Sequence, residues 1–166
     1  MTLPNRAILY QINISQGGVP KRPIKQAHIS FEGVDGDRQK NRAVHSGPDH
    51  ALCLYSLECI ETLRQEGHSI AAGSSGENLT ISGLDWSFLK PGDQLRIGDT
   101  VQIEMTQYAI PCRHNAQWFL EKNYKRVSHK LHPGWSRIYA KVLVEGSVQP
   151  GDPVFTEVNS PMEILV

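Results

Sequence analysis

Residues 95–106 read LRIGDTVQIEMT, and they carry the clearest structural pattern in the chain. From residue 101 to residue 106 apolar and polar side chains alternate, which puts Val101, Ile103 and Met105 on one face of a β-strand. Gly98 and Asp99 separate this strand from a shorter apolar run, and such a pair is typical of a tight turn because glycine tolerates a positive φ. The stretch therefore predicts a β-hairpin with one buried face.

Turn residues separate several more short apolar runs, which predict further strands at residues 6–14, 51–55, 78–81, 138–144 and 154–158. Helices are expected at residues 57–65, with Ser56 as the N-cap, and at residues 114–123, with Ala116, Phe119 and Leu120 turned inward. Many short strands with few helices favour a mostly-β domain, either a barrel or a sandwich. We expect a single domain over residues 1–158 and a C-terminal tail over residues 159–166.

The overall composition argues against several classes of protein. With 17 Lys and Arg against 17 Asp and Glu in 166 residues, the chain has no formal net charge, unlike a nucleic-acid coat or a polybasic membrane binder. No apolar run approaches the roughly 18 residues of a membrane span, and none near the N-terminus resembles a signal peptide. Three cysteines cannot all pair within one chain, so reduced thiols and a cytoplasmic location are expected.

Charge is unevenly distributed along the chain. Within residues 113–141, Glu121 is the lone acidic side chain. The basic side chains of this segment are Arg113, Lys122, Lys125, Arg126, Lys130, Arg137 and Lys141. A basic run of this kind is often only a solvated surface. It also supplies the positive potential that favours a small anionic ligand.

One of the three cysteines differs from the others. Cys53 lies in an apolar run and Cys59 lies on the first predicted helix, so both are expected to be buried core residues. Cys112 follows the long predicted strand, directly after Pro111, where sheet pairing stops and a side chain can face a ligand. Arg113 and the basic run beyond it favour the thiolate, the form that attacks electrophiles and binds soft metals.

Familiar local motifs for nucleotide hydrolysis, dinucleotide binding, zinc proteolysis and α/β-hydrolase chemistry are absent from the sequence. Glycine-containing loops with Lys or Arg nearby can present N–H groups and charge to a phosphate, although most such loops are only turns. A Cys-His hydrolase is disfavoured, because Cys112 and His114 are only two positions apart.

Eight short segments follow one another in order along the chain. They are Ser15-x-Gly17-Gly18-Val19-Pro20-Lys21, Gly36-Asp37-Arg38, His45-x-Gly47-Pro48-Asp49-x-Ala51, Leu54-Tyr55-Ser56-Leu57-Glu58, Gly76-Glu77-Asn78-Leu79-Thr80, Pro91-Gly92-Asp93, Ile110-Pro111-Cys112 and Val142-Leu143-x-Glu145-Gly146. As an ordered set, from about Ile8 to Phe155, they resemble the MOSC domain, named for the C-terminal part of molybdenum cofactor sulfurases. The resemblance is closest to the small stand-alone bacterial branch of that family.

The resemblance implies a mostly-β fold, a β-barrel of the pyruvate-kinase-barrel type with a few short helices. It also implies binding of the molybdenum cofactor, a pterin that carries a phosphate and a dithiolene. Cys112 matches the cysteine that ligates molybdenum or carries sulfur to the cofactor in this superfamily. By motif position, Lys21, Arg38 and Asn78 are implied cofactor contacts, and His45 is implied as a catalytic residue for proton transfer.

Two further arginines complete the predicted cofactor site. Arg113 follows Cys112 directly, and Arg137 ends a segment, residues 132–137, that departs from the Arg-Gly-Gly-Trp pattern expected of the family. A second departure follows His45, where Ser46 stands in place of the usual glycine.

Two enzymatic functions and one non-enzymatic function remain open. A molybdenum-dependent reductase of N-hydroxylated compounds would need an electron-donor protein, because the sequence has no flavin or iron–sulfur motif. A sulfur carrier would need a cysteine desulfurase as partner. The alternative is a non-catalytic module that binds a small anionic ligand or a partner protein. Neither nucleic acid nor a membrane is an expected partner, no pyridoxal phosphate site is expected within this chain, and a homodimer remains open.

Overall fold

The computed structural model describes residues 6–38 and 47–157. Strands dominate, and α2 (Leu57–Gln65) is the one α-helix of the described residues. The strands are β1 (Ile8–Ile14), β2 (Arg22–Ile24), β3 (Ala27–Ser30), β4 (Gly33–Val34), β5 (Leu52–Ser56), β6 (Leu79–Ser82), β7 (Gln94–Ile97), β8 (Val101–Tyr108), β9 (Ile138–Val144), β10 (Gly146–Val148) and β11 (Val154–Glu157). The 3₁₀ turns are η1 (Pro48–His50), η2 (Trp86–Phe88), η3 (Arg113–Trp118), η4 (Leu120–Lys122) and η5 (Tyr124–Val127).

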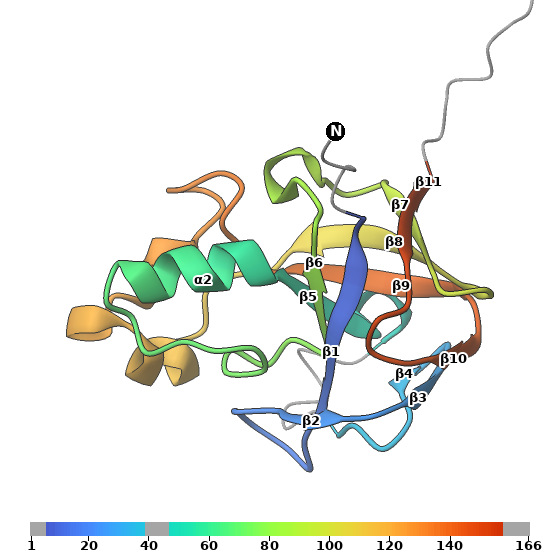
Figure 1. Ribbon diagram of the computed structural model, residues 1–166. Helices are drawn as coiled ribbons and strands as arrows, with labels where there is room; N and C mark the ends of the chain where they lie inside the picture. Colours follow the sequence, from blue (N-terminus) through green and yellow to red (C-terminus); the bar gives the residue numbers. More distant parts are fainter. Residues whose placement is uncertain (1–5, 39–46, 158–166) are drawn as a thin grey trace, which may run out of the picture.

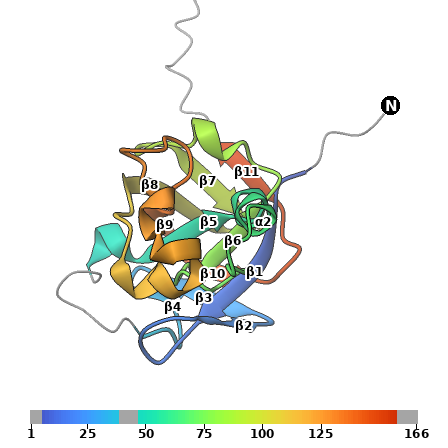
Figure 2. The same ribbon diagram turned by 90° about the vertical axis from the view of Figure 1, so that its left-hand side faces the viewer.

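Eight strands form one sheet in the order β11-β7-β8-β9-β5-β6-β1-β2, and β10, β3 and β4 form a small second sheet. Hydrogen-bonded neighbours run antiparallel, with one exception, the parallel pair of β5 and β6. Helix α2 and the turns η3 to η5 lie together at one side of the large sheet (Figure 1). Figure 2 views the molecule from that side. The mostly-β prediction is confirmed.

The hairpin predicted over residues 95–106 forms as β7 and β8. The two strands pair antiparallel from Gln94 opposite Glu104 to Ile97 opposite Val101, and Gly98 in the turn has a φ of 62°. Val101, Ile103 and Met105 are at most 1% exposed, so the alternating pattern identified the buried face correctly.

A closed barrel, by contrast, is not what the large sheet forms, and this part of the fold prediction needs correction. Strands β2 and β11 are its two edges, and Ile8 of β1 meets the segment before β11 only at an isolated bridge to Pro153. Hydrogen bonds from Leu9 N–H to the Asp152 carbonyl (2.8 Å) and from Val154 N–H to the Ala7 carbonyl (2.9 Å) flank this bridge. Proline has no N–H to continue a hydrogen-bond ladder. The pairing between β1 and the segment before β11 is therefore interrupted, and the sheet does not close into a continuous barrel.

The first predicted helix is confirmed as α2. The Ser56 hydroxyl accepts a hydrogen bond from the Cys59 N–H, and Ile60 and Leu63 are buried. The chain leaves the helix at Gly67, whose φ of 104° suits glycine.

The second predicted helix, residues 114–123, is wrong. This segment forms two 3₁₀ turns, η3 and η4. Phe119 between them is extended, with φ −109° and ψ 142°, and so interrupts any continuous α-helix. The extended backbone buries the Phe119 ring beside His68 and turns the Leu120 N–H toward His68 Nδ1, at 3.0 Å. Leu120 is consequently 52% exposed rather than turned inward.

The strand predictions at residues 6–14, 51–55, 78–81, 138–144 and 154–158 correspond to β1, β5, β6, β9 and β11 within two residues, the last residue, 158, lying outside the described part. Strands β2, β3, β4 and β10 were missed, since each is at most four residues long and shows no sustained alternation. In the described residues, no helix is long and apolar enough to cross a membrane. The predicted tail over residues 159–166 lies outside the described part, and the single-domain boundary at 158 stays a prediction.

Candidate functional site

A cavity of about 740 Å³ opens where the end of β8, the start of β9 and the loops after β1 and β4 meet. This volume lies within the range of small-molecule sites. The cavity brings together six of the seven residues predicted for the site from the sequence: Lys21, Arg38, Asn78, Cys112, Arg113 and Arg137. The seventh, His45, lies outside the described residues.

Cys112 stands between the end of β8 and turn η3. Its side chain is half-buried, and its carbonyl accepts a hydrogen bond from the Asn115 N–H at 2.9 Å. Sheet pairing stops shortly before Cys112, as predicted. The Ala109 N–H still donates to the Arg137 carbonyl, but Pro111, two residues later, has no N–H with which to continue the pairing. The thiol thus lines the cavity from a fixed backbone position.

Arg137 is a buried cation with few partners. Its side chain is 7% exposed, Nη1 donates to Cys53 Sγ at 3.8 Å, and Nη2 donates to the Ile110 carbonyl at 3.5 Å. No carboxylate pairs with this guanidinium among residues 6–38 and 47–157. Removing a charge from water is costly unless it is paired, so the site favours an anionic occupant.

Aromatic side chains hold the backbone just before Arg137. The Tyr55 hydroxyl donates to the Trp135 carbonyl at 2.5 Å, and Trp86 Nε1 donates to the Ser136 carbonyl at 2.8 Å. Both anchors are buried in the core. They fix the start of β9 and therefore the direction from which Arg137 enters the cavity.

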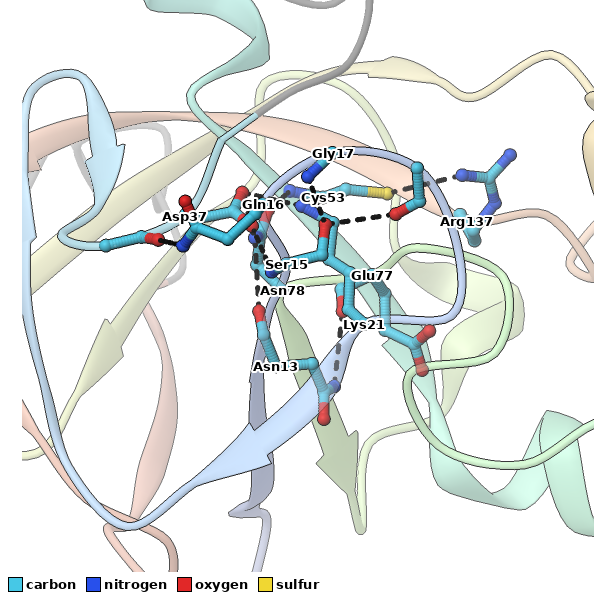
Figure 3. A network of polar contacts seen from close by, with 12 residues as sticks. Asn13, Ser15, Gln16, Gly17, Lys21, Asp37, Cys53, Glu77, Asn78 and Arg137 are labelled. Carbon is cyan, nitrogen blue, oxygen red and sulfur yellow. Dashed lines mark hydrogen bonds and ion pairs between the residues drawn. The ribbon is translucent and has the colours of Figure 1, made fainter.

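Lys21 and Asn78 contact the same buried carboxylate, that of Asp37, in the polar network of Figure 3. Lys21 Nζ lies 2.5 Å from Asp37 Oδ2, and Asn78 Nδ2 donates to the same oxygen at 2.9 Å. In the sequence Asp37 is only one member of the Gly36-Asp37-Arg38 motif, and its role as the shared partner follows from the tertiary structure.

The glycine loop after β1 forms another part of the lining. Ser15 Oγ accepts a hydrogen bond from the Gly17 N–H at 3.3 Å and donates to the Gly18 carbonyl at 3.0 Å. This loop is tied to the loop after β4, because Arg38 N–H donates to the Ser15 carbonyl at 2.8 Å. The two loops therefore place Gly17, Gly18 and Arg38 on one rim of the cavity.

Several lining residues are not evident from the sequence. Cys53 was predicted as core only; it is buried, and it also lines the cavity, where burial raises the pKa of its thiol. Asn115 is buried, Nδ2 donates to the Ser75 carbonyl at 3.0 Å, and Oδ1 has no partner in the described part of the chain. An α-helical interpretation of residues 114–123 gave no reason to expect Asn115 at a binding site.

The electrostatics of the cavity are one-sided. Lys21, Arg38, Arg113 and Arg137 line it, and among the described residues no Asp or Glu does. The nearby Glu77 is fully buried, accepts a hydrogen bond from Thr80 Oγ1 at 3.0 Å, and has its carboxyl pKa raised by burial. An anion with a group that binds a soft thiolate would match this combination.

Comparison with known proteins identifies the family and the fold. A family model for the MOSC domain matches residues 41–155. The chain belongs to the MOSC domain family. This family is associated with molybdenum cofactor binding.

Two curated relatives cover most of this chain. The MOSC protein is 33% identical over 136 residues to the uncharacterized protein YflK of Bacillus subtilis, covering 81% of this chain and 60% of YflK. It is 36% identical over 127 residues to protein YiiM of Escherichia coli, covering 74% of this chain and 55% of YiiM. The chain thus spans only 60% and 55% of the length of these relatives.

Among solved structures, YiiM from Geobacillus stearothermophilus superimposes with a TM-score of 0.69 at 24% identity. The superposition covers 90% of this chain and 74% of that protein. At this identity the likeness establishes the fold alone. The MOSC fold is therefore shown by the family model and by the structural neighbour together.

Proposed function

We propose that this MOSC protein binds the molybdenum cofactor in the cavity and that Cys112 is the residue that ligates the metal. The supporting observation is that one cavity combines a half-buried thiol with three arginines, Arg38, Arg113 and Arg137. Thiolate is a soft ligand suited to such a metal, and arginine forks suit a phosphate.

The fit of the cofactor rests on cations without a carboxylate partner, and on one unpaired acceptor, among the residues that the structure describes. Arg137 is buried without a carboxylate, and Arg38 and Arg113 have no side-chain partner among the described residues. Asn115 adds a buried Oδ1 that accepts no hydrogen bond in the described part of the structure. An anionic pterin supplies both an anion for the arginines and N–H donors for acceptors in the wall.

In this proposal the residues that line the cavity divide the binding of the cofactor between them. The arginines bind and orient the phosphate, and Gly17 and Gly18 of the loop after β1 line the same cavity. Cys112 holds the metal from a backbone fixed by the Asn115 N–H. When bound, the cofactor supplies a metal centre able to take an oxygen atom from a substrate.

As the reaction we propose reduction of N-hydroxylated compounds with electrons from a partner protein. Cys112 is half-buried in the cavity lining, whereas a sulfur carrier has to present its sulfur to a second protein for loading. Sulfur carriage is therefore the second candidate, and a non-catalytic anion-binding module is the third.

The metal proposal is tested by purifying the protein from cells that make the cofactor and measuring molybdenum and pterin per chain. We expect both in the parent and loss of molybdenum in Cys112→Ser. Cys59→Ala, on helix α2, is the matched control and should keep the metal. A parent without molybdenum or pterin contradicts the proposal.

The same preparations separate the three functions. Reduction of an N-hydroxylated base that is lost in Cys112→Ser supports the reductase. A labile extra sulfur on Cys112 in the mass spectrum, without bound metal, supports the sulfur carrier. A protein that binds pyrophosphate but holds no metal, carries no extra sulfur and reduces no N-hydroxylated base supports the non-catalytic binding module.

The anion site is tested by calorimetric titration of the protein with pyrophosphate. Arg137→Met should weaken binding about tenfold or more, since a charge-assisted hydrogen bond contributes about 1.5–3 kcal/mol. Arg96→Met is the matched control, because Arg96 pairs with Glu157 and lies outside the cavity lining. Equal loss in both variants would point to a general charge effect and contradict a specific site.

A further inference from the structure

Asp37 is a buried carboxylate that serves three donors. Its side chain is 6% exposed. Oδ1 accepts the Ser15 N–H at 2.9 Å, and Oδ2 accepts Asn78 Nδ2 at 2.9 Å and faces Lys21 Nζ at 2.5 Å. The donors come from the loop after β1, the segment before β2 and the segment before β6. Asp37 does not itself line the cavity, whereas all three of its partners do.

The lysine of this cluster is committed to Asp37. Its side chain is 9% exposed, so the ion pair is almost completely withdrawn from water. The Lys21 backbone is fixed as well, because its N–H donates to the Gly73 carbonyl at 2.8 Å. A buried ion pair holds its partners strongly, since separating them leaves an uncompensated buried charge.

The asparagine is committed too. Both hydrogens of Nδ2 are used, one toward Asp37 Oδ2 and one toward the Asn13 carbonyl at 3.3 Å. Oδ1 accepts the Cys53 N–H at 3.1 Å. An amide has two donors and one carbonyl oxygen, so little capacity remains for a ligand.

The arginines differ in this respect. Arg38 and Arg113 are exposed and have no side-chain partner in residues 6–38 and 47–157, and Arg137 makes only the long contacts to Cys53 and Ile110. The described cations of the cavity thus fall into two groups: one lysine neutralised by Asp37, and three arginines that form no ion pair with any carboxylate of residues 6–38 and 47–157.

We infer that Asp37 is a positioning residue that commits Lys21 and Asn78 to the protein framework and leaves recognition of the anion to the arginines. This inference concerns the cavity of the proposed function. Its statement about anion recognition rests on that proposed function. It reassigns two residues that the family resemblance implied as cofactor contacts. Lys21 shapes the wall and offsets the charge of Asp37 without binding the ligand.

The state of Lys21 is tested by acylating the lysines of the parent protein with an amine-specific reagent and measuring each lysine by mass spectrometry. Lys25 is exposed and serves as the internal control. We expect Lys21 to react at least about tenfold more slowly than Lys25, because its ammonium is buried and paired. Asp37→Asn keeps an acceptor for the Ser15 N–H. In this variant the acylation rate of Lys21 should rise, while that of Lys25 stays unchanged.

Two results of this labelling would overturn the inference. One is a parent in which Lys21 reacts as fast as Lys25. The other is a folded Asp37→Asn variant in which Lys21 stays slow, since burial alone and not Asp37 would then withhold the amine. Neither depends on a ligand, and the parent measurement needs no variant.

The role of Lys21 in anion binding is tested with the double variant Lys21→Met/Asp37→Asn, which leaves the net charge unchanged. Its pyrophosphate affinity should stay within about twofold of the parent, while Arg38→Met should lose about tenfold. A tenfold loss in the double variant makes Lys21 a ligand and overturns the inference. If the parent binds no pyrophosphate, the anion site proposed above fails, and the lysine labelling still decides the role of Asp37.

Discussion

The Tyr55 hydroxyl donates a hydrogen bond to the Trp135 carbonyl, 2.5 Å away, and this contact fixes β5 to the backbone two residues before Arg137. Tyr55 is completely buried, and Trp135 is half-buried against the core. This hydrogen bond and the one from Trp86 Nε1 to the Ser136 carbonyl therefore link core packing to the candidate site. Any loosening of this contact acts on the position of the Arg137 guanidinium.

Tyr55→Phe should lower the free energy of unfolding by about 1 kcal/mol or more, because it removes the hydrogen bond to the part-buried Trp135 carbonyl. Denaturant unfolding followed by fluorescence measures the difference. Tyr10→Phe is the control: Tyr10 is 45% exposed, and its change should stay within about 0.5 kcal/mol. If the two variants are equally stable, the contact contributes nothing.

Gly73→Ala should be strongly destabilising. Gly73 has a φ of +85°, and an added Cβ would lie 2.4 Å from the Lys21 carbonyl oxygen. We expect a loss of about 2 kcal/mol or more, since both the backbone conformation and the contact with the Lys21 segment are disturbed.

Gly151→Ala separates these two causes. Gly151 has a φ of +96°, but a Cβ there would meet no atom within 4 Å. Its cost should be about 1 kcal/mol, the cost of the left-handed backbone alone. Equal thermal shifts for the two variants would show that close approach at Gly73 is unimportant.

Alkylation should distinguish the three cysteines. At pH 8 iodoacetamide should modify Cys112 first, because Cys53 and Cys59 are buried and burial raises both of their thiol pKa values, that of Cys59 to about 11. At that pKa only about 0.1% of Cys59 is thiolate at pH 8. Peptide mass spectrometry reads the sites, and in urea all three should react. Rapid labelling of Cys53 in the folded protein would contradict this prediction.

Stability should fall at alkaline pH. Burial raises the pKa of Cys59 from 9.0 to about 11 and that of Tyr139 from 10.0 to about 12, and it also raises the pKa of Cys53. Above pH 9 the unfolded chain releases these protons while the folded chain retains them, so the free energy of unfolding falls as the pH rises. The loss runs from pH 9 to about 12, and each pKa unit corresponds to about 1.4 kcal/mol.

Cys59→Ala provides the check on that pH dependence. Removing the thiol should flatten the stability curve between pH 9 and pH 11 by roughly 3 kcal/mol, whatever its effect at neutral pH. Urea unfolding at fixed pH values gives both curves. Parallel curves would mean that Cys59 does not contribute to the alkaline loss.

Much of the fold could be predicted from local pattern. Alternation over residues 101–106 identified the buried face of β8, and Ser56 with the following apolar spacing identified α2. These signals are local, because side-chain direction in a strand or helix follows from the backbone period. The turns η3 and η4 could not be predicted this way, since Phe119 is extended to pack on His68, far away in sequence.

By itself the sequence determined the mostly-β character of the chain, the family motifs in their order, and Cys112 as a thiol placed where a strand ends. Local propensities and spacing carry that information within a few residues. Only the tertiary structure decided which charges meet. Asp37 neutralises Lys21 across 16 positions of the chain, while Arg137 lines the cavity without an ion pair to any described carboxylate. Pairing of charges depends on distances between distant segments, and those distances exist only after the sheet has folded.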